Sequence, residues 1–308
     1  MKWPLFLFGL LLAAAACGKT DKNAAPAVAA PEITEASLMA HVTFLTSKEL
    51  GGRQLGTAGE KAAAAYVEKH FRAAGFAPVK DTMIVPVLRP ERPETLNVVG
   101  ILRGQSDRIV LVGAHLDHLG VRDGKLYPGA DDNASGVAAL LEICRLLASA
   151  ELKKTLVCVA FGGEEAGLVG SRAFVREATV ELAKIDRMVN LDMLGRPLFE
   201  SLFGQAKPDG LGVIVHKIPE TELDEVLAIT KAEGVETMSL PEAWIRKLQA
   251  GFAYDSMPFN ERGVATLFFS SSLHADYHQP TDTADRLAPR QLRNRAAAIA
   301  KIIAKLAQ

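Results

Sequence analysis

The chain has few cysteines and no excess of charge of either sign. Its 308 residues include three cysteines, and 35 basic against 36 acidic residues leave a formal net charge of −1. Neither a basic surface for nucleic acid nor an acidic tail is indicated, so partners of those kinds are not expected. A long hydrophobic run is also missing: the apolar stretch at residues 3–16 is shorter than the roughly 20 residues that a membrane-spanning helix needs.

That short apolar stretch predicts an export signal instead. Lys2 precedes it, and small residues lead from it to Cys17, which is typical of a secretory signal at residues 1–17. Ala-Ala-Ala-Cys17 resembles a bacterial lipoprotein box, although Ala14 stands where a leucine is usual. We therefore expect an exported protein whose lipidated Cys17 is its only membrane contact, anchored in the cell envelope, in the periplasm or on the outer membrane. A plain cleaved signal, giving a secreted protein, is the alternative; residues 18–34 are expected to form a flexible tether.

Two cysteines remain inside the predicted domain, and both lie in apolar patterns. Cys144 falls in a helix-like pattern, and Cys158 falls in the pattern of a buried strand. We interpret them as packed thiols. A disulfide stays open for an exported protein, and a catalytic cysteine is not expected at either position.

Alternating strand and helix patterns predict an α/β fold. Continuous apolar runs at residues 108–114 and 155–161 are typical of strands that are covered on both faces. Helix-like patterns lie around these runs, which indicates a three-layer α/β/α sandwich with a mixed, largely parallel sheet, in one domain at residues 35–308. Residues 197–253 break this alternation, and we interpret them as a variable insert over the site. Three aromatic residues are candidates for a substrate pocket wall, with ordinary core packing as the alternative: Trp244, Phe252 and Tyr254.

Acidic residues and histidines follow several of the predicted strands. His115 comes directly after the first apolar run. Glu164 and Glu165 follow the second run, and Asp192 ends a later strand. Ligands bind outside the carboxyl ends of strands in such sheets, so these side chains are expected to meet at one edge. A pair of zinc ions needs one bridging carboxylate plus a histidine and a carboxylate for each ion, and the chain offers such a set: His115, Asp132, Glu165, Asp192 and His278.

The adjacent Glu164 and Glu165 are expected to have different roles. Two neighbouring carboxylates beside a metal repel each other unless one binds the metal and the other exchanges a proton. Two glycines precede this pair, and a helix is predicted to begin near Glu164, where its N-terminus would favour negative charge. Asp117, two residues after His115, is expected to accept a hydrogen bond from that imidazole and so to orient it.

Several motifs, in order along the chain, resemble those of the M28 family of zinc peptidases. They are Gly-Ala-His115-Leu-Asp117, Gly-Ala-Asp-Asp132-Asn133-Ala-Ser-Gly136, Gly-Glu164-Glu165-Ala-Gly, Asp192-Met and Tyr277-His278. The resemblance runs from about Leu45 to the C-terminus and includes an upstream Gly-Gly-Arg53-x-x-Gly-Thr segment. It implies the fold of zinc-dependent exopeptidases. One departure is Ser256, which replaces the histidine of a Ser-Asp-His motif common in the family, whereas Asp255 is kept.

The resemblance also implies how two cocatalytic zinc ions would be bound. Asp132 would bridge the ions. Glu165 and His278 would complete one position, and His115 and Asp192 would complete the other. Nitrogen and oxygen ligands of this kind also accept cobalt or manganese, so the sequence does not fix the metal used in the cell.

The remaining roles implied by the resemblance concern catalysis and support. Glu164 would be the general base, and Tyr277 would stabilise the oxyanion of the transition state. Asp117 and Asp282 would support the ligands from behind. The peptide bond after the bridging Asp132 would be cis.

The leading hypothesis is a two-zinc aminopeptidase that removes N-terminal residues from peptide substrates outside the cytoplasm. Three alternatives stay open: a glutaminyl cyclase-like enzyme with the same fold and one zinc ion, a carboxypeptidase, and a peptide-binding lipoprotein without activity. The complete ligand set argues against the first and the last of these. His118 and His274 lie near the motifs and are candidates for contacts behind the ligands.

Overall fold

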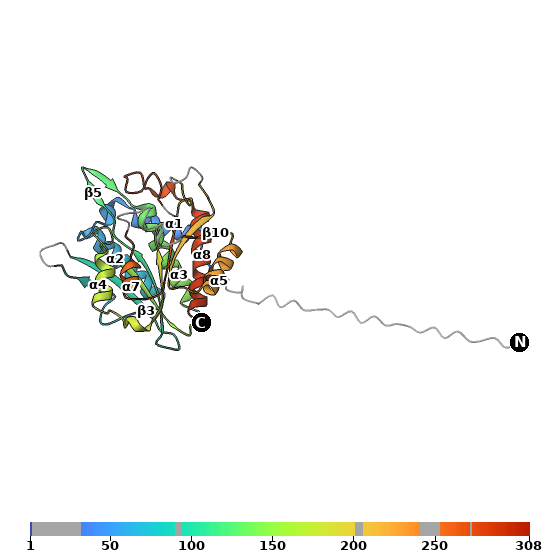
Figure 1. Cartoon of the computed structure of the whole chain (residues 1–308). Helices are drawn as coiled ribbons and strands as arrows, with labels where there is room; N and C mark the ends of the chain where they lie inside the picture. The colour runs from blue at the N-terminus through green and yellow to red at the C-terminus, as the bar shows by residue number, and fades with distance from the viewer. Residues whose placement is uncertain (2–31, 90–93, 201–205, 241–252, 272) are drawn as a thin grey trace. The chain divides into compact units, whose positions relative to one another are not determined.

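A mixed sheet forms the middle layer of the protein (Figure 1). The computed structural model describes residue 1 and residues 32–89, 94–200, 206–240, 253–271 and 273–308. Nine strands of this part form the sheet: β1 Ala77–Pro78, β2 Ile84–Val87, β3 Thr95–Leu102, β4 Ile109–His115, β7 Thr155–Phe161, β8 Ile185–Leu191, β9 Gly210–His216, β10 Glu236–Leu240 and β11 Thr266–Ser270. Two more strands, β5 Gly120–Arg122 and β6 Lys125–Tyr127, form a separate hairpin.

The central strands of the sheet are parallel. The order is β1-β3-β7-β4-β8-β11-β9-β10, and β2 also pairs with β3. Strands β7, β4, β8 and β11 run in one direction, so their carboxyl ends lie at one edge. Antiparallel pairs flank them, between β3 and β7 and between β11 and β9. Helices cover both faces, so the predicted α/β/α sandwich around a mixed sheet is confirmed.

Alternating side chains of the central strands build two apolar cores. In β4, Val110 and Val112 belong to the larger core, whereas Ile109 and Leu111 belong to the smaller one. Every residue of β4 and β7 is buried. Because helices remove both faces of these strands from water, each strand reads as a continuous apolar run rather than as an alternating one.

Helices cover the two faces of the sheet unequally. Five described helices contribute to the larger core: α1 Glu35–Leu45, α2 Ala58–Ala73, α3 Gly136–Leu147, α5 Glu220–Ala232 and α8 Pro289–Leu306. Two further described helices contribute to the smaller one: α4 Val169–Arg176 and α7 Met257–Glu261. The helices predicted around the apolar runs of the sequence are confirmed. The helix predicted to begin near Glu164 begins only at Val169.

Residues 210–240 lie within the predicted insert and form part of the main sheet. Strand β9, helix α5 and strand β10 form a continuous unit in which β9 pairs with β11 and β10 pairs with β9. This part of residues 197–253 therefore extends the main sheet. That residues 197–253 vary and lie over the site stays a prediction. The sequence pattern does not reveal this unit, because α5 lies at the surface and is mostly polar. Only Val226 and Thr230 of this helix are buried.

Cys144 and Cys158 form a disulfide between α3 and β7. This finding corrects their interpretation as packed thiols. Helix α3 packs on the face of the sheet to which Cys158 points, so both sulfur atoms lie in the larger core. The two cysteines are 14 residues apart and meet only because α3 packs on β7. The local patterns of the sequence do not show this packing.

The predicted export signal at residues 1–17 and most of the tether predicted at residues 18–34 lie outside the described residues. Glu32–Gln308 form one compact unit. None of the described helices combines the length and the apolar character that crossing a membrane requires.

Candidate metal centre

Neighbouring parallel strands bring predicted ligands to one edge of the sheet. Strand β4 ends at His115, which pairs with Phe161 at the end of β7. Strand β8 pairs with β4 on the other side and is followed directly by Asp192. Glu165 follows β7 after a glycine turn. The expected meeting of strand ends is therefore present in the structure.

His115, Asp132 and Asp192 form the first group of possible ligands, and all three are buried. The Nε2 atom of His115 lies 3.2 Å from Asp132 Oδ1 and 3.3 Å from Asp192 Oδ1. Burial by itself lowers the pKa of His115, but the two carboxylates outweigh burial and hold this pKa well above its ordinary value. The carboxylates of this group therefore strongly stabilise a positive charge placed between them.

His278 and Glu165 form the second group, again with Asp132. The Nε2 atom of His278 lies 3.2 Å from Asp132 Oδ2 and 3.1 Å from Glu165 Oε2. Burial lowers the pKa of His278, but its hydrogen bonds to the two carboxylates outweigh burial and raise the pKa to about 9. Asp132 therefore turns one carboxylate oxygen toward each group.

The donor atoms of both groups fit divalent cations. Imidazole nitrogen and carboxylate oxygen are ligands that zinc accepts, with bonds of about 2.0–2.2 Å. Two ligands of one tetrahedral ion are then roughly 3.3 Å apart. The nitrogen–oxygen separations of 3.1–3.3 Å in the two groups are close to this value.

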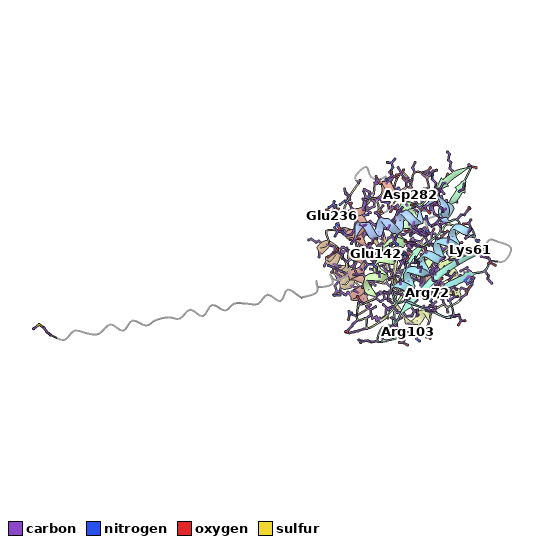
Figure 2. The ribbon with its side chains drawn as sticks, turned by 180° about the vertical axis from the view of Figure 1, so that it is seen from behind. Lys61, Arg72, Arg103, Glu142, Glu236 and Asp282 are labelled. Carbon is purple, nitrogen blue, oxygen red and sulfur yellow. A yellow bond between two sulfur atoms is a disulfide. The ribbon has the colours of Figure 1, made fainter. Side chains whose placement is uncertain are left out.

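The loop that carries Asp132 is held from behind by Asp282. The Asp282 carboxylate accepts the backbone N–H groups of Asp131, at 3.0 Å, and of Asp132, at 3.1 Å. Asp282 lies at the upper end of the molecule, whereas Arg103, just beyond the end of β3, lies at the lower end (Figure 2). The peptide bond between Asp132 and Asn133 is cis, as the resemblance implied.

Asp117 supports the site in a different way from the one predicted. Its carboxylate accepts the backbone N–H groups of Glu164, at 3.0 Å, and Glu165, at 3.3 Å. The Nδ1 atom of His115 lies 3.1 Å from the carbonyl oxygen of Asp117 and 4.0 Å from its carboxylate. The backbone is therefore the nearer acceptor for the imidazole. The side chain instead holds the turn before α4, where the sequence predicts a helix N-terminus.

Glu164 and Glu165 differ in their affinity for protons. Burial, reinforced by nearby acidic groups, raises the pKa of Glu164 well above its ordinary value. Burial also acts to raise the pKa of Glu165, but hydrogen bonds from neighbouring imidazoles outweigh it and lower this pKa. Adjacent carboxyl groups with opposite shifts suit a proton carrier beside a cation ligand.

Comparison with known proteins places the chain in a family. The model of "Peptidase family M28" matches residues 97–303, which include all five predicted ligands. The chain is a member of peptidase family M28.

Curated relatives of this M28 chain are longer than it is. An aminopeptidase of Pseudomonas aeruginosa (strain UCBPP-PA14) is 41% identical over 142 residues, which cover 43% of this chain and 25% of the relative. Aminopeptidase YwaD of Bacillus subtilis (strain 168) is 28% identical over 208 residues, which cover 64% of this chain and 41% of the relative. The M28 chain thus matches less than half of the length of either relative.

Solved structures share the fold of the M28 chain at low identity. BSAP, a zinc aminopeptidase from Bacillus subtilis, has a TM-score of 0.70 and 17% identity, and the match covers 90% of this chain and 96% of that one. A glutaminyl cyclase from Porphyromonas gingivalis has a TM-score of 0.69 and 18% identity, covering 90% and 100%. Because both proteins share the fold, these likenesses do not choose between the two activities.

Tyr277 lies against the second group of the M28 site. Its ring stacks on the ring of His278, with centroids 3.8 Å apart and an angle of 18° between the planes. Burial, together with the charges of the nearby carboxylates, raises the pKa of the Tyr277 phenol far above its ordinary value. The phenol therefore keeps its proton and remains a hydrogen-bond donor.

The three aromatic candidates for a pocket wall are only partly described. Trp244 and Phe252 lie outside the described residues. Tyr254 is buried, and its ring stacks on Phe268 at a centroid distance of 4.5 Å. Tyr254 therefore packs in the core, which is the alternative that the sequence left open.

One histidine lies closer to the ligands than the sequence indicated. The Nδ1 atom of His118 lies 2.9 Å from Glu165 Oε1 and 3.7 Å from Asp132 Oδ2. His274 contacts Asp131 instead, with its Nε2 atom 3.2 Å from Oδ2. The signal for His118 was its place three residues after a ligand, but the sequence does not show that the loop turns this side chain back toward the site.

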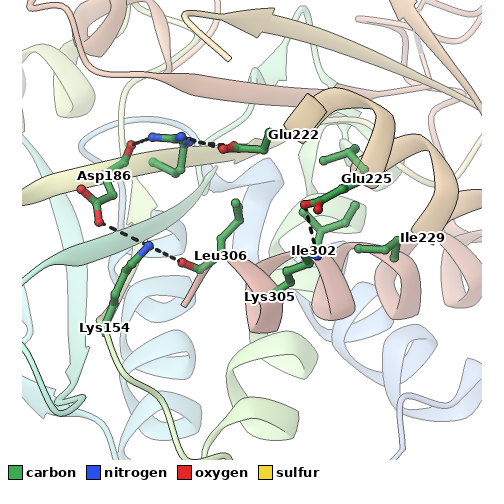
Figure 3. A pocket seen from close by; sticks show the side chains of 10 residues that line it. Lys154, Asp186, Glu222, Glu225, Ile229, Ile302, Lys305 and Leu306 are labelled. Carbon is green, nitrogen blue, oxygen red and sulfur yellow. Dashed lines mark hydrogen bonds and ion pairs between the residues drawn. The ribbon is translucent and has the colours of Figure 1, made fainter. Parts of the chain in front are cut away.

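A cavity of about 380 Å³ lies at the opposite end of the sheet, near the starts of β7 and β8 (Figure 3). Its charged lining residues form pairs: Lys154 with Asp186 at 3.3 Å, Arg187 with Glu222 at 2.6 Å, and Lys305 with Glu225 at 3.1 Å. Since these charges already neutralise one another, the cavity offers less to a charged ligand than the metal centre does.

Proposed function

We propose that this M28 chain is an aminopeptidase that uses two zinc ions. The observation that carries the proposal is the position of Asp132, whose two oxygens face separate pairs of a histidine and a carboxylate. Glu165 and His278 would hold one ion, His115 and Asp192 would hold the other, and Asp132 would bind both. The names of the curated relatives support the choice of aminopeptidase.

The residues around these ligands supply the proton transfers of peptide hydrolysis. When bound, zinc ions make water more acidic and polarise the scissile carbonyl group. Glu164, whose pKa is raised, accepts a proton from the attacking water and passes it to the leaving amine. Tyr277 keeps its own proton and donates a hydrogen bond to the oxyanion. Asp117 holds the backbone of Glu164 in place for this transfer.

Metal content and substrate choice test this proposal together. We expect two zinc ions per chain by inductively coupled plasma mass spectrometry and hydrolysis of aminoacyl-p-nitroanilides. Chelation should abolish turnover, zinc should restore it, and acetylation of the substrate's amine should prevent it.

Other results would select one of the alternatives. One zinc ion with cyclisation of N-terminal glutamine indicates a glutaminyl cyclase. Release of C-terminal residues from acetylated peptides indicates a carboxypeptidase. Two bound zinc ions without turnover of any peptide indicate a binding protein.

We also propose that the protein is exported and lipid-anchored through Cys17. The disulfide between Cys144 and Cys158 supports export, because disulfides persist in oxidising compartments. In bacteria fed a labelled fatty acid, the wild-type chain should carry the label and partition into detergent, and Cys17→Ser should do neither. A wild-type chain without label would leave the plain cleaved signal as the explanation.

A further inference from the structure

His118 adds a third imidazole to the second ligand group. We propose that His118 is a positioning residue: its Nδ1–H group donates a hydrogen bond to Oε1 of Glu165 and leaves Oε2 of that carboxylate for the cation. This inference rests on the proposed two-zinc function and deepens it. The hydrogen bond from His118 fixes the orientation of the Glu165 carboxylate, which the five proposed ligands alone do not do.

Each carboxylate oxygen of Glu165 faces its own imidazole. Oε1 lies 2.9 Å from Nδ1 of His118, and Oε2 lies 3.1 Å from Nε2 of His278. A separation of 2.9 Å is the usual length of an N–H···O hydrogen bond. Because His118 occupies Oε1, a cation shared with His278 would meet Oε2.

His118, Asp132 and Glu165 also offer donor atoms close enough to hold a metal ion, but the distances of His118 suit a ligand less well than those of His278. Two ligands of one tetrahedral zinc ion are roughly 3.3 Å apart. The Nε2 atom of His278 lies 3.1 Å and 3.2 Å from the oxygens of Glu165 and Asp132, which fits a shared ion. Nδ1 of His118 lies 2.9 Å and 3.7 Å from the same two carboxylates, so one separation is shorter and the other longer than expected.

The surroundings of His118 also select the protonated nitrogen. Its Nε2 atom is buried and has no hydrogen-bond partner among the described residues. A proton on Nε2 would leave a buried N–H group unsatisfied and would turn the Nδ1 lone pair toward a carboxylate, and both are unfavourable. A proton on Nδ1 removes both penalties, so the environment favours the tautomer that donates to Glu165.

Close packing holds the His118 ring in this orientation. Gly129 has a φ of +60°, and a Cβ atom on it would lie 2.5 Å from Cγ of His118, so only glycine leaves room for the ring. The ring of His278 meets it edge to face, with centroids 5.8 Å apart. A side chain that is 1% exposed and packed in this way has little freedom to release Glu165.

The hydrogen bond has a consequence for the number of protein ligands. With Oε1 committed to His118, Glu165 offers one oxygen rather than two. The second ion would then be held by three protein atoms, from Asp132, Glu165 and His278. Three protein ligands and an open position are what a catalytic zinc site requires.

Two variants of nearly equal size separate the hydrogen bond from packing. The amide nitrogen of His118→Asn can take the place of Nδ1, whereas His118→Leu has no donor. Zinc dissociation constants are measured by chelator competition in the absence of substrate, and Glu165→Ala identifies the second site. We expect His118→Leu to weaken that site by about 10- to 100-fold. The dissociation constant of the second site in His118→Asn should stay within about threefold of wild type. His70→Leu makes the same histidine-to-leucine change on α2, away from the site, and should also stay within about threefold.

The outcomes that overturn the proposal are equally defined. If His118→Leu binds zinc at the second site as tightly as wild type, His118 does not position Glu165. If His118→Leu and His118→Asn lose zinc affinity equally, the hydrogen bond donated by Nδ1 is not the cause. The ¹⁵N NMR spectrum of the imidazoles, assigned with His118→Asn, should show a protonated Nδ1 at His118 with and without zinc. A zinc-bound or unprotonated Nδ1 overturns the proposal. If wild type binds one zinc ion or cleaves no peptide, the proposed function fails, but this resonance still decides the role of His118.

Discussion

Replacing Glu164 with glutamine is expected to lower kcat by roughly 10²- to 10⁴-fold, the range that general acid–base catalysis contributes. The amide keeps the shape of the side chain but does not accept a proton from water. Zinc content should stay at the wild-type level, because Glu164 belongs to neither ligand group. The measurement is steady-state turnover of an aminoacyl-p-nitroanilide, with metal content determined on the same sample.

The same change at the next residue is the matched control. Glu165→Gln removes the charge of a proposed ligand in the second group, so its loss of turnover should be accompanied by a loss of zinc. The two substitutions are one position apart in the chain, but Glu164→Gln should lower turnover alone, whereas Glu165→Gln should lower both turnover and zinc content. Normal turnover of Glu164→Gln, or an equal loss of zinc from both variants, would contradict the roles assigned to the two glutamates.

Arg53→Met is expected to give the largest loss of stability. Arg53 is 1% exposed, and its guanidinium group donates to four carbonyl oxygens: Leu45 at 2.6 Å, Leu116 at 2.9 Å, Pro128 at 2.7 Å and Gly129 at 3.0 Å. Burial lowers its pKa only to about 10, so the group stays charged near neutral pH. Each buried acceptor left unsatisfied costs about 1–3 kcal/mol, so we expect a loss of roughly 4 kcal/mol or more in the free energy of unfolding.

Urea unfolding measures this loss, and an exposed arginine provides the control. Arg72 pairs with Glu68 at 2.7 Å on the surface of α2, so Arg72→Met should cost about 0.3–0.5 kcal/mol. Arg53 also joins the two ends of the segment that carries the β5–β6 hairpin, between the proposed ligands His115 and Asp132. Its loss should therefore weaken zinc binding too. A small change in stability would show that water replaces the lost donors.

The sequence predicted those parts of the fold that depend on burial alone. Strands β4 and β7 are covered on both faces, so their apolar runs identify them without knowledge of their neighbours. His115 and Asp192 follow such strands directly, and parallel strands end at the same edge. The sequence alone therefore places the candidate ligands at strand ends together.

The remaining features depend on contacts between distant segments. The N–H groups of Glu164 and Glu165 bind the Asp117 carboxylate, and α4 begins later than predicted. The sulfur atoms of the disulfide meet only when α3 lies on the sheet. His118 reaches Glu165 because its loop turns back from the end of β4. None of these contacts changes the local periodicity of the sequence.

The disulfide also bears on how the site assembles. Helix α3, which carries Cys144, begins directly after the loop that holds Asp132, and β7, which carries Cys158, ends shortly before Glu165. The covalent bond therefore shortens the path along the chain between these two ligands. An oxidised chain that has not yet folded keeps the two ligand segments near each other, so closing the loop between them costs less entropy when they come together around a cation.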